Sequence, residues 1–389
     1  MSIAVKLGFV PLTDAAPLII AHDMGFAEEE GIKLKLSREV SWANIRDKVG
    51  FGIYQGAHML SPMPIAMAMG LGPKKTRPIV PIILSQNGNG LVLKPEIAAA
   101  IYRGAASFND PTTIGKSLVA LGKKKALRIG VPFMQSMHVA LMRYLIQRSG
   151  GKVGDHIRFV VAPPSLMNEV LAADEVDGFM VGAPYFSRAV DHNLAELVLL
   201  GSSIWKGAPE KVLALGETWL EENEEAALGL IRAIFKAQNW ADANKETGAL
   251  AELLSKPNYL NASVRRIEEA LCGQIQRNSA GEFVHDNLAI RFAAGDISFP
   301  WRSQAEWICA QEAPGWGILD PNASHIAKAC FRPDIYRKAI SKLGVAVPTA
   351  NAKVEGALND KKRIPAEQDL FLGPDFFFDF EKFEPSGVT

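Results

Sequence analysis

One strand–helix–strand plan occurs twice along the chain. The first copy predicts an apolar strand at residues 5–10, a helix at 15–24 and an alternating strand at 32–36. The second predicts a strand at 127–131, a helix at 136–148 and a strand at 157–161, followed by another helix and a strand at 176–181. Strands that alternate with helices form parallel sheets covered by helices. We therefore expect an α/β protein of two lobes with a cleft between them.

The chain is expected to pass between the lobes twice. It leaves the first lobe near residues 88–90 and returns near 202–211, which gives lobe I as 1–88 and 205–389 and lobe II as 89–204. A long amphipathic helix at 220–244 and further helices follow the return. The last part of lobe I is rich in phenylalanine, which predicts that the tail packs back on the body; these residues are Phe371, Phe376, Phe377, Phe378, Phe380 and Phe383.

Composition excludes several classes of protein. The 42 basic residues balance the 42 acidic ones, so no global field attracts nucleic acid or an anionic membrane. Three cysteines without a C-x-x-C pair argue against a disulfide framework and a zinc site. The sequence has no apolar window long enough for a membrane span and opens on a strand instead of a signal peptide. If Met1 is the natural start, we expect a cytoplasmic protein that has no cofactor.

Four side chains fall where a small anion would bind in such a fold. Ligands of open α/β sheets lie at the carboxyl ends of strands, where helix N-termini offer unpaired N–H groups. Trp42 and His138 lie in the first turns of predicted helices, Asn89 at the first crossing, and Lys211 just before a strand at 212–215. Asp14 is expected to cap the first helix. The four candidates would face one cleft from both lobes.

Each candidate also has a simpler interpretation. Trp42 is explained by packing, His138 by a structural role, Asn89 between two glycines by a turn, and Lys211 by an exposed surface position. The remaining histidines show no metal-ligand spacing, and the sequence has neither a phosphate-binding loop nor a nucleophile elbow. Nothing in these patterns supports catalysis, so we do not expect an enzyme.

Several segments resemble the nitrate and bicarbonate solute-binding family of ABC transporters. They follow the family's order, cover about 330 residues and lie at 8–18, 41–47, 56–64, 178–184, 205–211 and 332–336. The resemblance implies a type II periplasmic-binding-protein fold that closes on a hinge over an anion. A tryptophan, a glutamine, a histidine and a lysine hold nitrate in that family, and they match Trp42, Asn89, His138 and Lys211 here. Asn89 departs from the pattern because it is shorter than the family's glutamine.

The resemblance also bears on the ligand. Bicarbonate-binding relatives have an acidic residue that helps to recruit calcium where this chain has Lys211. All four candidates offer hydrogen-bond donors, nitrate and nitrite only accept, and bicarbonate also needs an acceptor for its hydroxyl. We therefore expect nitrate or nitrite as the ligand and no bound metal.

A leaderless member of this family cannot serve a permease from outside the cell. The resemblance to NasS-type nitrate and nitrite sensors implies a cytoplasmic protein that releases an RNA-binding antiterminator of the NasT type when the anion binds. Three alternatives stay open. One is a substrate-binding component of a nitrate transporter, numbered from its mature start, with Met1 added by cloning. The others are an enzyme on the same fold, such as a thiamine pyrimidine synthase, and an unrelated small-acid binder.

Overall fold

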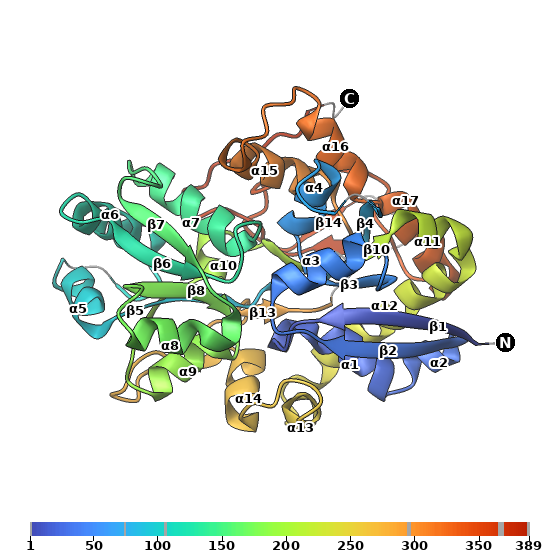
Figure 1. The fold of residues 1–389 in the computed structure, drawn as a ribbon, viewed down its shortest axis with the longest axis horizontal. Helices are drawn as coiled ribbons and strands as arrows, with labels where there is room; N and C mark the ends of the chain where they lie inside the picture. The colour runs from blue at the N-terminus through green and yellow to red at the C-terminus, as the bar shows by residue number, and fades with distance from the viewer. Residues whose placement is uncertain (1, 74, 105–106, 294–296, 365–368, 387–389) are drawn as a thin grey trace.

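The computed structural model describes residues 2–73, 75–104, 107–293, 297–364 and 369–386, so Met1 lies outside the described residues. Two mixed sheets form the centres of two α/β lobes, which lie side by side in Figure 1. Core clusters of buried apolar side chains fill the space between the sheets and their helices. The predicted α/β architecture with two lobes is confirmed.

The six-stranded sheet, on the right of Figure 1, has the order β13-β4-β10-β3-β1-β2. Strand β1 runs parallel to β2 and β3, whereas β10 is antiparallel to its neighbours β3 and β4. Its strands are β1 (Ile3–Phe9), β2 (Ile32–Arg38), β3 (Gly56–Leu60), β4 (Pro78–Asn87), β10 (Pro209–Gly216) and β13 (Ile290–Arg291).

The five-stranded sheet, on the left of Figure 1, has the order β7-β6-β8-β5-β9. Strand β6 is parallel to β7 and β8, and β5 is antiparallel to β8 and β9. Its strands are β5 (Asn89–Leu93), β6 (Leu127–Val131), β7 (Ile157–Val161), β8 (Gly178–Gly182) and β9 (Glu196–Leu200).

The expectation of purely parallel sheets is wrong in both lobes. The chain enters the second lobe through β5 and returns to the first through β10. Each of these strands begins beside the carboxyl ends of the parallel strands of its sheet. It must therefore run against them.

Helices cover both sheets, and most lie where the sequence predicts them. The predicted long helix at 220–244 is broken at Asn223, whose backbone leaves the helical region (φ −133°, ψ 44°). The helices of the first lobe are α1 (Ala16–Asp23), α2 (Phe26–Glu29), α3 (Trp42–Gly50), α4 (Pro62–Ala68), α11 (Glu217–Glu222), α12 (Glu224–Asn244), α13 (Ala249–Ser255), α15 (Arg302–Glu312), α16 (Ala323–Cys330) and α17 (Pro333–Ile340).

The second sheet carries its own helices, with α14 and a small hairpin packed near them. They are α5 (Pro95–Arg103), α6 (Pro111–Gly122), α7 (Met137–Arg148), α8 (Met167–Ala172), α9 (Tyr185–Asp191), α10 (Gly201–Ile204) and α14 (Val264–Cys272). The short 3-10 turns are η1 (Thr13–Ala15), η2 (Pro164–Leu166), η3 (Pro314–Trp316) and η4 (Ser341–Leu343), and the short strand pairs are β11 (Gln274–Gln276) with β12 (Phe283–His285) and β14 (Lys362–Ile364) with β15 (Leu370–Leu372).

Strands β5 to β9 lie in one sheet, and the other long strands lie in the second. One C-terminal segment lies across this division of the strands. Ala270, Ile275 and Ala289 join the core cluster of the five-stranded lobe, and the Leu197 N–H donates to the Arg277 carbonyl at 2.8 Å. The lobe boundaries at 88 and 205 stay a prediction.

The phenylalanine-rich tail packs on the body as predicted. Phe377 is buried and stacks on Trp205 and Trp307, with ring centroids 4.8 and 5.6 Å away. Beside it, Tyr144 of α7 donates its hydroxyl to Asp379 at 2.8 Å. The tail thus joins α7 of the second lobe to α15 of the first. Among the described residues, no helix is both long enough and apolar enough to span a bilayer.

Replacing Phe377 by alanine tests the contribution of this cluster. Removing a buried phenylalanine leaves a cavity, and we expect Phe377→Ala to lower the free energy of unfolding by about 3–5 kcal/mol in urea denaturation. Phe380 of the same tail is 66% exposed, so Phe380→Ala serves as the matched control and should cost less than about 1 kcal/mol. Equal losses in the two variants would contradict the packing described here.

Candidate functional site

In both sheets, the carboxyl ends of the parallel strands lie at the junction between the lobes. In the first lobe, η1 follows β1, α3 follows β2, and the first residues of β10 pair with the end of β3. In the second lobe, α7 follows β6, and Asn89 at the start of β5 pairs with Gly182 at the end of β8. Thr13 joins these ends of the two sheets, because its N–H donates to the Ala183 carbonyl at 3.0 Å. The four predicted site residues lie on these elements.

Lys211 lies at the centre of a fully buried ion cluster. Its Nζ is 2.7 Å from Asp14 Oδ2 and 2.7 Å from Glu210 Oε1, and the side chain is not exposed. The register of β10 shifts against β4 on both sides of Lys211, which is the mark of a β-bulge. The bulge explains how two consecutive side chains of one strand meet instead of pointing to opposite faces. The surface interpretation of Lys211 is therefore wrong.

Asp14 does not cap the first helix as expected. Ala15 occupies the N-cap position of α1, and no side chain caps it. The Asp14 carboxylate instead bonds Lys211 and, through Oδ1, the Nε2 atom of His58 at 2.9 Å. Burial alone would raise its pKa, but Lys211 and His58 outweigh burial and hold the pKa of Asp14 at about 2. Asp14 is therefore an ionised partner of the lysine.

Trp42 and His138 lie in the first turns of capped helices, as predicted. Ser41 Oγ accepts the Asn44 N–H at the start of α3, and Ser136 Oγ accepts the Val139 N–H at the start of α7, both at 3.3 Å. Both side chains are buried, and Lys211 Nζ lies 5.6 Å from the centroid of the Trp42 ring.

Three nitrogen atoms of these two residues have no hydrogen-bond partner within the described chain. They are Nε1 of Trp42 and both ring nitrogens of His138; the nearest acceptor to His138 is Glu210 Oε1, 3.5 Å from Nε2. Burial holds the pKa of His138 well below its ordinary value, so the imidazole is neutral at neutral pH. A neutral imidazole has one N–H, which leaves two unpaired donors at the junction.

Asn89 reaches the same cluster by a different contact from the one expected. Its Nδ2 donates to Glu210 Oε2 at 2.6 Å, so the amide donor is engaged, and its Oδ1 lies unpaired within the described chain. A Cβ at residue 201 would stand 2.0 Å from that Oδ1, so Gly201 is required for this approach. The turn interpretation of Asn89 is wrong, because the residue begins β5.

The structure brings the four predicted residues together but adds three that the sequence analysis missed, namely Asp14, His58 and Glu210. Asp14 and Glu210 add two carboxylates, which accept hydrogen bonds when ionised, to the four donors that the sequence analysis selected. Glu210 is fully buried, and burial raises its pKa above the ordinary value although Lys211 opposes the shift. No simple pattern marks Glu210, since strand alternation places it on the face opposite Lys211.

Within the part of the chain that the structure describes, no group of three or more histidine, cysteine or acidic side chains is arranged to hold a metal ion. The ammonium of Lys211 already neutralises one of the two carboxylates, and the imidazole of His138 is neutral. Whether Trp42, Asn89, His138 and Lys211 contact a ligand stays a prediction.

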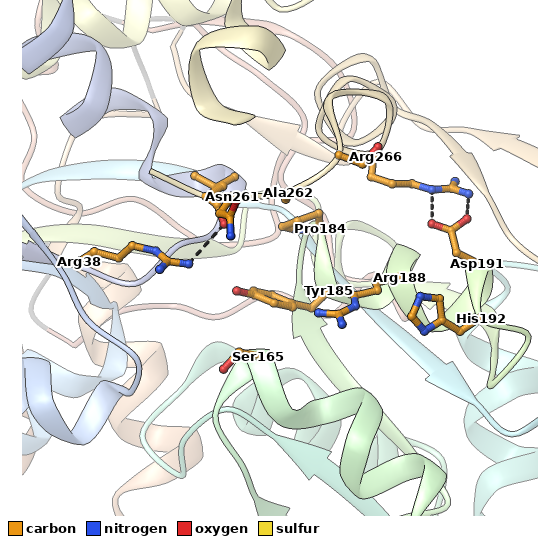
Figure 2. A pocket seen from close by; sticks show the side chains of 12 residues that line it. Arg38, Ser165, Pro184, Tyr185, Arg188, Asp191, His192, Asn261, Ala262 and Arg266 are labelled. Atoms are coloured by element: carbon orange, nitrogen blue, oxygen red, sulfur yellow. Dashed lines mark hydrogen bonds and ion pairs between the residues drawn. The ribbon is translucent and has the colours of Figure 1, made fainter. Parts of the chain in front are cut away.

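A cavity of about 540 Å³ lies between elements of the two lobes, and its lining includes none of the residues of the ion cluster (Figure 2). Its wall includes Pro184, next to the Ala183 carbonyl that accepts the Thr13 N–H. Arg38 from the end of β2 and Arg188 from α9 also line it, and among the described residues neither forms an ion pair with a carboxylate. Two unpaired cations give this side of the junction a positive potential that attracts small anions.

Replacing Lys211 tests the buried ion cluster. In Lys211→Met, two carboxylates stay buried without their counter-charge, and we expect the free energy of unfolding near neutral pH to fall by about 3–5 kcal/mol. The triple variant Lys211→Met, Asp14→Asn, Glu210→Gln removes all three charges and should recover most of this loss in urea denaturation. A single-variant loss below about 1 kcal/mol would show that the lysine is not the counter-charge of the cluster.

Comparison with known proteins gives relatives over almost the whole chain. The nitrate/nitrite binding protein NrtA of Nostoc sp. PCC 7120 is 29% identical over 387 residues, 98% of this chain and 82% of that protein. The bicarbonate-binding protein CmpA of Synechococcus elongatus is 27% identical over 369 residues, 90% and 81% of the two chains. The crystal structure of the periplasmic nitrate-binding protein NrtA from Synechocystis PCC 6803 matches with a TM-score of 0.83 at 25% identity, covering 99% and 96% of the chains.

The fold is therefore that of the periplasmic binding proteins, with two α/β lobes about a ligand site, as the resemblance implied. The relatives that match along nearly the whole chain are named as nitrate- or bicarbonate-binding proteins. The model of the NMT1-like family matches residues 2–255, well over half of the chain. The chain belongs to the NMT1-like family and is similar throughout to nitrate- and bicarbonate-binding proteins of ABC transporters.

Proposed function

We propose that the chain binds nitrate or nitrite at the junction of the two lobes. The observation that carries this proposal is the set of buried, unpaired donors on Trp42 and His138 beside the ammonium of Lys211. A buried polar group without a partner costs about 1–3 kcal/mol. A small oxyanion that accepts from several directions relieves this cost at the indole and the imidazole together.

The names of the relatives do not decide between nitrate and bicarbonate as the ligand. One relative is named for nitrate and nitrite and another for bicarbonate, so similarity alone leaves both anions open. The ammonium of Lys211 in the centre of the cluster repels a divalent cation, which disfavours calcium-assisted binding. Nitrate and nitrite share the same acceptor chemistry, and both are included in the proposal.

Both lobes supply residues to the proposed site, so binding of the anion is coupled to closure of the two lobes. Trp42 and Lys211 belong to elements of the first sheet, and His138 to the helix that follows β6 of the second. An anion that contacts both sets holds the lobes together, so it binds the closed arrangement more tightly than an open one.

We further propose that this closure reports the anion to another protein in the cytoplasm. An RNA-binding antiterminator of the NasT type that prefers the open arrangement would be released when nitrate or nitrite binds, because the two ligands weaken each other reciprocally. The chain itself has a balanced charge, 42 basic and 42 acidic residues, which suits a protein partner better than nucleic acid. The alternative function is a substrate-binding component of a nitrate transporter, which the names of the relatives favour.

Calorimetric titration of nitrate tests the binding proposal. The best very small ligands reach about 1.5 kcal/mol per heavy atom, so nitrate with four such atoms is expected to bind with a Kd of tens of micromolar or lower. Trp42→Phe keeps the ring but removes the N–H, and should raise the Kd by about 10- to 150-fold, the equivalent of about 1.5–3 kcal/mol.

Trp240→Phe on α12, away from the junction, is the matched control and should leave the Kd unchanged. Nitrite is expected to compete with nitrate, and bicarbonate with or without calcium is not. Binding of bicarbonate that depends on calcium, together with no heat from nitrate, would reject the proposed ligand.

Co-purification with a NasT-type antiterminator tests the sensor proposal. The complex should dissociate on size-exclusion chromatography when nitrate is added, and Trp42→Phe should shift the nitrate concentration required upward by the same factor as its Kd. A complex that persists at saturating nitrate, or no complex at all, would favour the transporter alternative.

A further inference from the structure

The site holds more negative charge than an anion-binding protein needs. Five titratable side chains face one another there, and none of them is exposed: Asp14 from η1, His58 from β3, His138 from α7, and Glu210 and Lys211 from β10. With both carboxylates ionised and both histidines neutral, the cluster has a net charge of one negative unit. Trp42 and Asn89, which complete the site, are uncharged.

An anion that entered this cluster unaccompanied would leave two uncompensated negative charges in a buried space. Burial of an unpaired charge is so costly that ionisable groups change their protonation state instead. Among the described residues, the basic side chains that pair with these two carboxylates are Lys211 and the neutral His58 and His138. A proton from solvent is therefore the natural counter-charge.

Glu210 is placed to receive that proton. Its two oxygens face three of the four predicted anion-binding residues: Nδ2 of Asn89 at 2.6 Å, Nζ of Lys211 at 2.7 Å and Nε2 of His138 at 3.5 Å. The side chain of Asp14, by contrast, bonds only His58 and Lys211 among the residues that the structure describes. An anion that uses Asn89, His138 and Lys211 thus meets the Glu210 carboxyl directly.

We propose that Glu210 is a further anion-binding residue, which takes up one proton from solvent as the anion enters and then donates its O–H to the anion. The O–H bond forms on a Glu210 carboxylate oxygen, the proton comes from the acid form of the buffer, and no bond of the anion breaks. The net charge of the cluster then stays the same with and without the anion. This inference rests on the proposed binding of nitrate or nitrite.

The other titratable groups are poorer proton acceptors. Burial alone would raise the pKa of Asp14, but Lys211 and His58 hold it at about 2, and burial keeps the pKa of His138 well below the ordinary value. Burial also lowers the pKa of His58, although Asp14 opposes the shift. Of the five groups, Glu210 alone combines burial that raises its pKa with contact to the predicted anion-binding residues.

Nitrate titration by calorimetry in two buffers of different ionisation enthalpy counts the protons directly. We expect uptake of about one proton per nitrate at pH values above the pKa of Glu210 in the free protein, and a Kd that rises about tenfold per pH unit over the range above that pKa. Binding heat that is the same in both buffers, with a Kd independent of pH, would overturn the proposal while leaving nitrate binding intact.

Glu210→Gln presents a permanently neutral side chain with an N–H donor at the same place. It should bind nitrate without proton uptake, with a Kd that does not change with pH and is lower than that of the parent at the high end of the range. Asp177→Asn is the matched control, a carboxylate-to-amide change at a residue that binds Arg128 in the second lobe, and should leave the proton count unchanged.

The variant His138→Asn tests which residue of the Glu210–His138 contact takes up the proton. The proton count should stay near one if Glu210 is the acceptor, although binding is weaker, and loss of uptake in this variant would assign the proton to His138 and reject the proposal. Absence of nitrate binding by the parent at every pH would instead reject the proposed function itself.

Discussion

The buried ammonium of Lys211 is the interaction on which the site depends. Two carboxylates approach it from different parts of the chain, Asp14 from the loop after β1 and Glu210 from the same bulged strand. Each carboxylate then positions a residue of its own: Asp14 holds His58, and Glu210 holds Asn89. Without the central cation, these like charges would repel one another in a medium that screens them poorly, and the edges of the two sheets could not meet so closely.

Much of the architecture follows from periodicity that is visible in the sequence. The strands Leu127–Val131 and Ile157–Val161 and the helix capped by Ser136 lie at the predicted residues, because apolar runs and a capping hydroxyl are local signals. The antiparallel direction of strands β5 and β10 was not predicted. Their direction is set by where the chain crosses between lobes, and that is a property of the whole topology.

The cluster of site residues was also predicted only in part, because local signals reveal some of its members and the topology sets the others. Trp42 and His138 lie in helix first turns, which local patterns reveal, and Asn89 and Lys211 lie near the expected crossings between the lobes, where the resemblance to a known family also pointed. Asp14 looked like a cap because aspartate before an apolar helix usually is one. Glu210 could not be assigned, since only the bulge in β10 turns it toward Lys211. The sequence analysis therefore selected the four donor residues of the cluster but neither of its two carboxylates.

Helix α7 links two regions that are far apart in the sequence. His138 lies in its first turn, while Tyr144, further along, is hydrogen-bonded to Asp379 and Arg148 at its last residue pairs with the same carboxylate. Twelve helical residues form a stiff rod of about 18 Å. If binding of the proposed anion by His138 tilts this rod, its far end and the C-terminal tail bonded to it must move as well.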